Sequence, residues 1–245
     1  RVAGSPNPRP TMHFPDYPFS PQRFQVRPGI EMSYLDEGPR DGEVVVMLHG
    51  NPSWSYYWRK LVSGLSDRWR CIVPDHVGMG LSDKPGDEAY AYTLASRIED
   101  LAALLDHLGI AGKVTLAVHD WGGMIGFGWA LRDPSRVARL VILNTAAFPL
   151  PAEKPMPWQL RLGRDSRLGA LAIRGFNAFS SAASFVGVET RMPSDVRAAY
   201  VAPMTSTAAP ARSIDETLAE LVEEFDLLGD WEGRIEYVID LGKDL

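Results

Sequence analysis

Short apolar runs alternate with longer segments of helical periodicity through most of the first 145 of these 245 residues. Such runs are typical of strands buried on both faces of a sheet, and the segments between them place apolar residues three to four positions apart. The predicted strands are Glu31–Asp36, Val44–Leu48, Cys71–Pro74, Val114–Val118 and Val137–Leu143, and the predicted helices are Tyr56–Leu65, Leu94–Leu108 and a short one that ends at Leu131. This alternation predicts an α/β fold, a mostly parallel sheet flanked by helices.

The pattern changes at both ends of this region. The first twenty-nine residues are rich in proline and predict an extended segment or an edge strand. After Asn144, four prolines precede a helical-looking stretch with several aromatic residues, which has the pattern of an inserted lid. The predicted organisation is a core over 1–149, a partial lid over 150–204, a linker of small residues over 205–212 and a helical tail over 213–245.

Charge is distributed unevenly between these parts. The net charge is −6, but residues 213–245 carry 11 acidic and 2 basic residues, a balance of −9, so the first 212 residues carry +3. No basic cluster interleaved with aromatic residues is present, and an acidic tail repels phosphate, so the sequence argues against nucleic acid as a partner.

Cysteine content and hydropathy suggest a compartment. The single cysteine, Cys71, excludes an internal disulfide and a cysteine-built zinc site, and its apolar surroundings indicate a core position. The longest apolar run, Val44–Leu48, is far shorter than the roughly 20 residues that a bilayer span needs, and no leader-like segment opens the chain. We therefore expect a cytoplasmic protein without a membrane span.

The candidate chemistry lies in Val118-His119-Asp120-Trp121-Gly122-Gly123, where a buried strand gives way to a helix. A sharp turn at this place projects one side chain above the sheet, and small residues let the helix pass close to the strand. The projected residue here is Asp120, whose ionised carboxylate attacks carbon without a base and forms an ester. The alternative is that Asp120 is an ordinary helix N-cap.

A second element follows the first apolar run, in His49-Gly50-Asn51-Pro52. At this position the architecture provides a donor for an anion that develops during reaction. The backbone N–H groups of Asn51 and Trp121 are expected to face one point, and the Asn51 amide and the Trp121 indole N–H are also able to bind an anion such as halide. We expect His49 to pack and hydrogen-bond beneath the loop rather than to act in catalysis.

These stretches identify a resemblance. From about residue 14 to residue 204 the chain resembles the α/β-hydrolase superfamily, in its aspartate-nucleophile branch of haloalkane dehalogenases. The match is carried by HGNPSWSYYWR from His49, by PDHVGMGLSDKP from Pro74 and by VHDWGG from Val118. The sequences RPGIEMSYLDEGP from Arg27 and LNTAAFPLP from Leu143 are most similar to those of the OleB group of β-lactone decarboxylases in olefin biosynthesis.

The resemblance implies a division of roles. Asp120 would be the nucleophile, Asn51 and Trp121 would stabilise the anion, and a haloalkane or β-lactone would be the substrate, without cofactor or metal. Epoxide hydrolases share the Asp-Trp-Gly step but usually have an aromatic residue where Asn51 stands, so an epoxide is the alternative substrate. The loop Asp75–Ser82 is expected to be structural, with glycines that serve its turns.

Two parts of the family pattern are not matched. The family's general-base histidine follows the lid, whereas no histidine follows His119 here, and Asn144 stands where some dehalogenases have their acid. Residues 213–245 instead resemble the start of a SufE-type sulfur acceptor, through EEFDLLGDWEGRIEYVIDLGKDL from Glu223. This implies a cysteine desulfurase as a partner. The alternatives are an acidic amphipathic hairpin without such a role, and a catalytically incomplete fragment or fusion.

Overall fold

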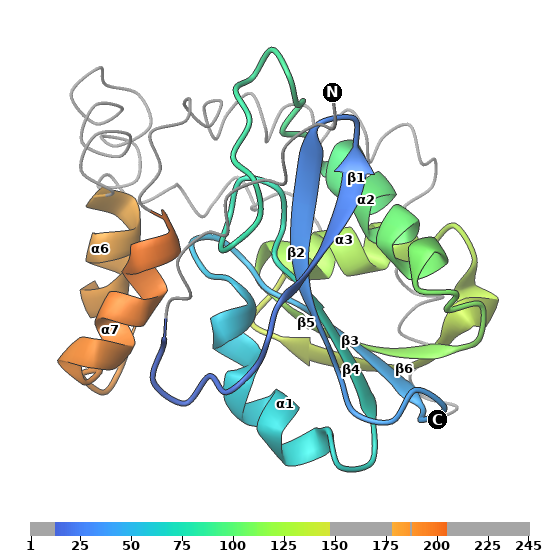
Figure 1. Ribbon diagram of the computed structural model, residues 1–245, viewed down its shortest axis with the longest axis horizontal. Coiled ribbons are helices and arrows are strands. Elements are labelled where there is room, and N and C mark those ends of the chain that lie inside the picture. Colours follow the sequence, from blue (N-terminus) through green and yellow to red (C-terminus); the bar gives the residue numbers. More distant parts are fainter. Residues whose placement is uncertain (1–12, 148–177, 187, 205–245) are drawn as a thin grey trace, which may run out of the picture.

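The computed structural model describes residues 13–147, 178–186 and 188–204, drawn in colour in Figure 1. A six-stranded sheet in the order β1-β2-β4-β3-β5-β6 forms its centre. The strands are β1 (Gln22–Arg27), β2 (Ile30–Glu37), β3 (Val44–Leu48), β4 (Arg70–Pro74), β5 (Val114–His119) and β6 (Val137–Leu143). β4, β3, β5 and β6 run parallel, whereas β1 and β2 pair antiparallel at one side, which confirms the predicted mostly parallel sheet.

Helices cover both faces of this sheet, as Figure 1 shows. The helices of the described residues are η1 (Ser55–Trp58), α1 (Arg59–Leu65), α2 (Leu94–His107), α3 (Trp121–Ala130), η2 (Pro134–Arg136), α6 (Ala178–Val186), α7 (Ser194–Val201) and η3 (Ala202–Met204). The predicted helix over 56–65 therefore begins as a 3-10 turn. At the start of α2, the Thr93 hydroxyl accepts a 3.1 Å hydrogen bond from the Ser96 N–H. Gly109 follows the helix with a left-handed φ of +65°.

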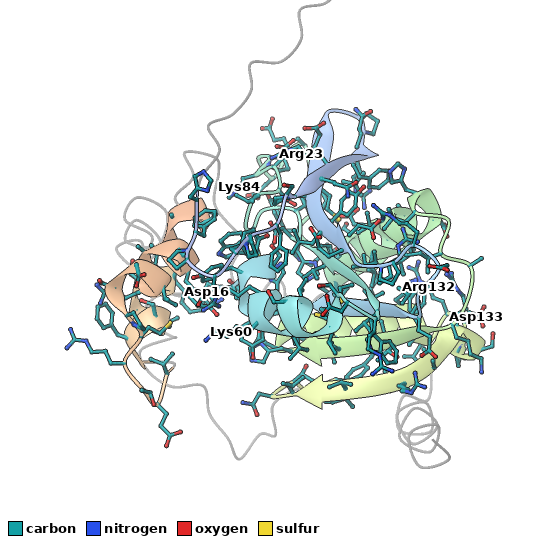
Figure 2. All side chains as sticks on the ribbon, turned by 60° about the horizontal axis from the view of Figure 1, so that its bottom comes forward. Asp16, Arg23, Lys60, Lys84, Arg132 and Asp133 are labelled. Atoms are coloured by element: carbon teal, nitrogen blue, oxygen red, sulfur yellow. The ribbon has the colours of Figure 1, made fainter. Side chains whose placement is uncertain are left out.

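The alternation of side chains along β3 divides the core into two layers. Val46 and Leu48 pack with residues of α2 and α3, whereas Val45 and Met47 pack on the other face with Val62 of α1. Cys71 is fully buried in the second layer, as expected for a core cysteine. Side chains fill the space between sheet and helices, while charged residues such as Arg132 and Asp133 lie at the periphery (Figure 2).

One strand departs from the prediction. The run Val137–Leu143 was expected to be buried on both faces, but in β6 Val141, Ile142 and Leu143 are 45%, 54% and 37% exposed. The physical reason is its place in the sheet, since among the described strands β6 is the last and pairs only with β5.

The helices α6 and α7 lie together at one side of the molecule (Figure 1). Contacts with the segment after the Asn51 loop hold α7 in place: the Trp54 indole N–H donates to the Ala199 carbonyl at 3.1 Å, and Tyr56 meets Tyr200 edge to face at 5.0 Å. The Arg59 guanidinium lies 3.9 Å from the Tyr56 ring centroid. Much of the predicted lid, and all of the predicted linker and tail at 205–245, fall outside the described residues.

Among the helices of the described ranges, none combines the length and the apolar character that a bilayer crossing requires.

Candidate active site

Asp120 stands between the end of β5 and the start of α3, on a backbone with φ 51° and ψ −128°. A positive φ is costly for a residue with a side chain and is found where the surrounding structure enforces it. The Asp120 side chain makes no capping hydrogen bond to α3. The alternative interpretation as a capping aspartate is therefore wrong, and the geometry is that of a strand-to-helix elbow that projects the carboxylate.

Glycines make this elbow sterically feasible. A Cβ on Gly50 would lie 2.2 Å from the Asp120 Cβ, so the carboxylate side chain occupies the space that a side chain at position 50 would need. A Cβ on Gly122 would lie 2.2 Å from the Leu48 carbonyl oxygen, and one on Gly123 would lie 1.9 Å from the Thr145 hydroxyl. Close passage of α3 over the ends of its neighbouring strands thus excludes larger residues at these positions.

Asn51 is brought to Asp120 by the parallel sheet. β3 and β5 are neighbours that end at the same edge, so the loop after β3 meets the elbow after β5. The backbone N–H of Asn51 donates a 2.8 Å hydrogen bond to Asp120 Oδ1. Trp121 is the first residue of α3, and its partly buried ring packs against the larger core cluster. Asn51 and Asp120 are therefore in direct contact, and Trp121 follows Asp120 in the chain.

Two further contacts at this point were not predicted from the sequence. The Thr145 hydroxyl, just beyond β6, donates to the Asp120 carbonyl at 2.5 Å, and the Asp120 N–H donates to the Asn144 carbonyl at 3.2 Å. These bonds hold the elbow backbone from the β6 side. Their positions in the sequence could have indicated these contacts, because polar residues that follow adjacent parallel strands converge at one edge of the sheet. Asn144 itself is exposed and has a φ of 37°.

Tyr57 lies over the residue before the elbow. Its ring stacks on the His119 imidazole with centroids 4.5 Å apart and an interplanar angle of 16°. Burial, the Tyr200 hydroxyl and the Asp120 carboxylate, in that order, raise the pKa of the Tyr57 phenol. Burial also lowers the pKa of His119. Tyr57 thus covers the end of β5 that leads into Asp120.

The loop Asp75–Ser82 has the structural role expected of it. The Asp75 carboxylate is fully buried and accepts hydrogen bonds from the Ser55 N–H at 2.6 Å and from the Leu81 N–H at 2.8 Å. Burial raises its pKa to about 6. Gly78 and Gly80 have positive φ values of 90° and 51°, as turn residues do.

His49 is buried beneath its loop, as expected, and contacts His76 with ring centroids 4.3 Å apart. Neither imidazole touches Asp120. His107 lies on α2 and stacks on Phe24. In the described ranges, no three histidine, cysteine, aspartate or glutamate side chains are close enough to share a metal ion.

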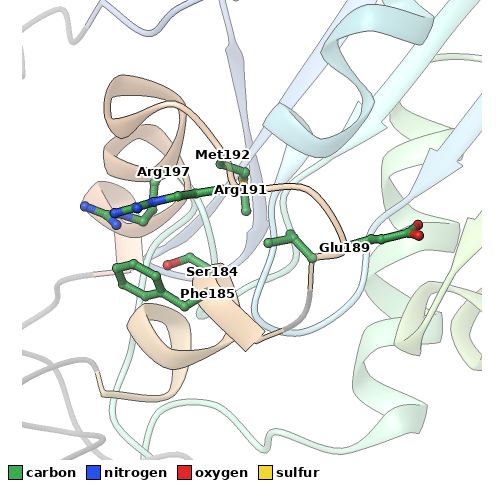
Figure 3. A pocket seen from close by; sticks show the side chains of 7 residues that line it. Ser184, Phe185, Glu189, Arg191, Met192 and Arg197 are labelled. Atoms are coloured by element: carbon green, nitrogen blue, oxygen red, sulfur yellow. The ribbon is translucent and has the colours of Figure 1, made fainter.

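A hollow of about 240 Å³ lies away from the elbow, between α6, α7 and their connection (Figure 3). Its lining includes Ser184, Phe185 and Met192, and the Arg197 guanidinium lies 4.2 Å from the Phe185 ring centroid. Asp120, Asn51 and Trp121 are not among its lining residues, so it is separate from the candidate active site.

The α/β hydrolase fold family model matches residues 43–208. This chain belongs to that family. Among curated relatives, this α/β hydrolase is 71% identical over 197 residues to a cis-3-alkyl-4-alkyloxetan-2-one decarboxylase of Xanthomonas campestris pv. campestris, covering 78% of this chain and 66% of the relative. It is 34% identical over 237 residues to a haloalkane dehalogenase of Mycolicibacterium paratuberculosis, covering 89% and 74%.

A solved structure is similar as well. The crystal structure of a haloalkane dehalogenase from Bradyrhizobium elkani USDA94 is 29% identical with a TM-score of 0.66, over 83% of this chain and 67% of that one. This α/β hydrolase spans just under two thirds of the length of the decarboxylase that it matches at 71% identity.

Proposed function

We propose that this α/β hydrolase forms a covalent ester between Asp120 and an electrophilic carbon of a β-lactone or haloalkane. The observation that carries the proposal is the elbow itself, which projects a carboxylate that caps no helix and holds Oδ1 against the Asn51 N–H. The 71% identity to an oxetan-2-one decarboxylase favours a β-lactone with two alkyl substituents as the natural substrate.

The first step is a displacement. The free carboxylate oxygen of Asp120 bonds to the saturated carbon that carries the leaving group, and that carbon's bond to halogen or to ring oxygen breaks. The electron pair leaves as halide, or as the carboxylate of the opened lactone. We assign the side-chain amide of Asn51 and the indole N–H of Trp121 as the donors that stabilise this anion.

For a β-lactone, a second step completes a decarboxylation without water. The bond from the ring carbon to the new carboxylate breaks, and its electron pair forms the carbon–carbon double bond. The ester bond to Asp120 breaks in the same step, which returns the Asp120 carboxylate and releases carbon dioxide and an alkene. The sum is lactone to alkene and carbon dioxide, so atoms and charge balance with Asp120 unchanged.

For a haloalkane, release of the ester requires water and a base. The printed chain has no histidine after His119, so we expect the alkyl ester to persist. Incubation with a long-chain bromoalkane should add one alkyl group per chain, located on Asp120 by peptide mass spectrometry. The Asp120→Asn variant should stay unmodified, whereas Asp133→Asn, at an exposed carboxylate far from the elbow, should react like the parent chain. Absence of an adduct in a folded sample would refute the proposal.

Contact of residues 213–245 with a cysteine desulfurase remains a proposal that rests on their resemblance to SufE-type proteins. A pull-down that compares the full chain with a variant ending at Arg212 is the test. Equal retention of the desulfurase by both would contradict the contact.

A further inference from the structure

Two buried histidines beneath the active-site loop are joined by a reciprocal pair of hydrogen bonds. His49 directly follows β3, and His76 lies in the loop after β4; they are 0% and 3% exposed. The backbone N–H of His76 donates to His49 Nε2 at 3.1 Å, and the His76 Nε2 atom lies 3.1 Å from the His49 carbonyl oxygen. Each residue thus uses its ring to bind the backbone of the other.

These bonds dictate where the ring protons are. His49 Nε2 accepts from a backbone N–H, so its proton is on Nδ1, which donates to the Gly50 carbonyl at 2.9 Å. A carbonyl only accepts, so His76 Nε2 carries the proton of the second ring. The His49 imidazole is therefore neutral with its proton on Nδ1, and the His76 ring carries a proton on Nε2.

The peptide group between Gly50 and Asn51 connects the His49 hydrogen bond to Asp120. The Gly50 carbonyl also accepts from the Ser53 N–H at 2.9 Å and from the Ser53 hydroxyl at 3.0 Å. The Gly50 C=O and the Asn51 N–H belong to the same trans peptide plane and point in opposite directions. Donors that fix the direction of the Gly50 carbonyl therefore also fix the direction of the Asn51 N–H, which points the opposite way, toward Asp120 Oδ1.

The surroundings keep the pair neutral. Burial lowers the pKa of His49 to about 3 and lowers that of His76 well below its usual value. The charged and titratable groups that face the pair are Arg97 from α2 and His119 from β5, and both oppose a further positive charge on His49. Protonation would also place an N–H of His49 Nε2 against the N–H of His76, so it would break the reciprocal bonds.

We propose that His49 and His76 are positioning residues that orient the Asn51 backbone N–H against the Asp120 carboxylate. The inference rests on the proposed role of Asp120 as the nucleophile. His49 supplies the donor to Gly50, and His76 holds the His49 ring in the tautomer and orientation that this donor requires. Neither residue contacts the substrate.

A matched pair of substitutions tests this role. In His49→Asn the side-chain amide N–H stands near the position of Nδ1 and keeps the donor to Gly50, whereas in His49→Gln the amide stands near Nε2 and the donor is lost. We expect His49→Gln to lower the maximal rate of adduct formation with a bromoalkane about tenfold, the effect of a lost orienting bond. We expect His49→Asn to keep most of the rate, and the half-saturating bromoalkane concentration to change little in either.

The exposed histidine of α2 provides the control, since His107→Asn should leave the rate unchanged. Near-ultraviolet circular dichroism confirms that each variant is folded. Equal rates in His49→Asn and His49→Gln overturn the proposal, because a merely structural role does not distinguish the two amides.

A spectroscopic measurement separates failure of this inference from failure of the proposed function. Nitrogen-15 NMR of the parent chain at pH 5 should show His49 protonated on Nδ1 alone and His76 on Nε2 alone. The Asn51 amide should exchange with solvent at least about tenfold faster in His49→Gln than in His49→Asn. If the parent chain forms no adduct, the role of Asp120 is wrong while these two results still support the orientation of Asn51. Other tautomers, or equal exchange in the two variants, overturn it.

Discussion

Asn51 and Asp120 are 69 positions apart in the sequence, yet the Asn51 N–H lies 2.8 Å from Asp120 Oδ1. The contact exists because β3 and β5 are adjacent parallel strands that end at one edge, and because position 50 has no side chain. In the proposed reaction, the oxygen held in this way leaves the second carboxylate oxygen to attack the substrate. The arrangement allows several quantitative tests.

Replacement of Gly50 by alanine should abolish adduct formation. The new Cβ would lie 2.2 Å from the Asp120 Cβ, so the carboxylate must leave its position and its bond to the Asn51 N–H. We expect a loss of reaction rate of at least about a hundredfold, equivalent to about 2.7 kcal/mol. The control is Gly64→Ala in α1, where nothing lies within 4 Å of the added Cβ and helix propensity favours alanine. Similar rates in both variants would contradict the steric argument.

Substitution of Thr145 by valine should weaken the elbow while keeping its shape. The variant loses the hydroxyl that donates to the Asp120 carbonyl, which leaves a strained backbone without one of its restraints. We expect the free energy of unfolding in urea to fall by about 1 kcal/mol and adduct formation to slow. The control is Thr93→Val, which removes the N-cap of α2 at a similar cost in stability but should leave the reaction rate unchanged.

Acid should destabilise the fold through the histidine pair. The folded-state pKa of His49 is about 3 and that of His76 is also lowered, so between about pH 6.5 and pH 3 the unfolded chain binds protons that the folded chain does not. Stability is therefore lost as pH falls, by about 1.4 kcal/mol per pH unit for each such group. Urea titrations from pH 7 to pH 4 should give a shallower slope for His76→Gln than for the parent chain. An equal slope would show that His76 is not buried neutral.

The apolar surface of β6 should promote self-association of the printed chain. Val141 and Ile142 are about half exposed on a strand that pairs with β5 alone among the described strands. Unpaired, apolar edges favour pairing with another chain. Ile142→Lys should lower the apparent mass in sedimentation velocity at high concentration. Leu61→Lys, at a comparably exposed residue on α1, should not. A parent chain that stays monomeric would contradict the prediction.

The sequence predicted the strands well because burial on both faces leaves an unambiguous apolar signal. Val44–Leu48 has the predicted bounds, and Val114–His119 exceeds its prediction by one residue. Exposure of β6 was not predictable, because Val137–Leu143 is an apolar run like the others and only the strand order shows that it is the outermost of the described strands on its side. Local composition does not encode that order.

The site was predictable only in part for a related reason. Asp120, Asn51 and Trp121 stand in motifs whose local turn chemistry is visible in the sequence. Thr145 and the His49–His76 pair act through backbone atoms of distant residues. A hydroxyl or imidazole that binds a carbonyl across the sheet leaves no spacing pattern, so the partners of Thr145, His49 and His76 are visible only in the folded structure.

The empty Cβ position at Gly50 also constrains protein engineering. The Asp120 side chain fits only because residue 50 has no Cβ, so any other residue at position 50 is incompatible with the present position of the carboxylate. Libraries that seek altered substrate scope should keep position 50 invariant and vary Tyr57, whose ring stacks beside the elbow without supporting the carboxylate.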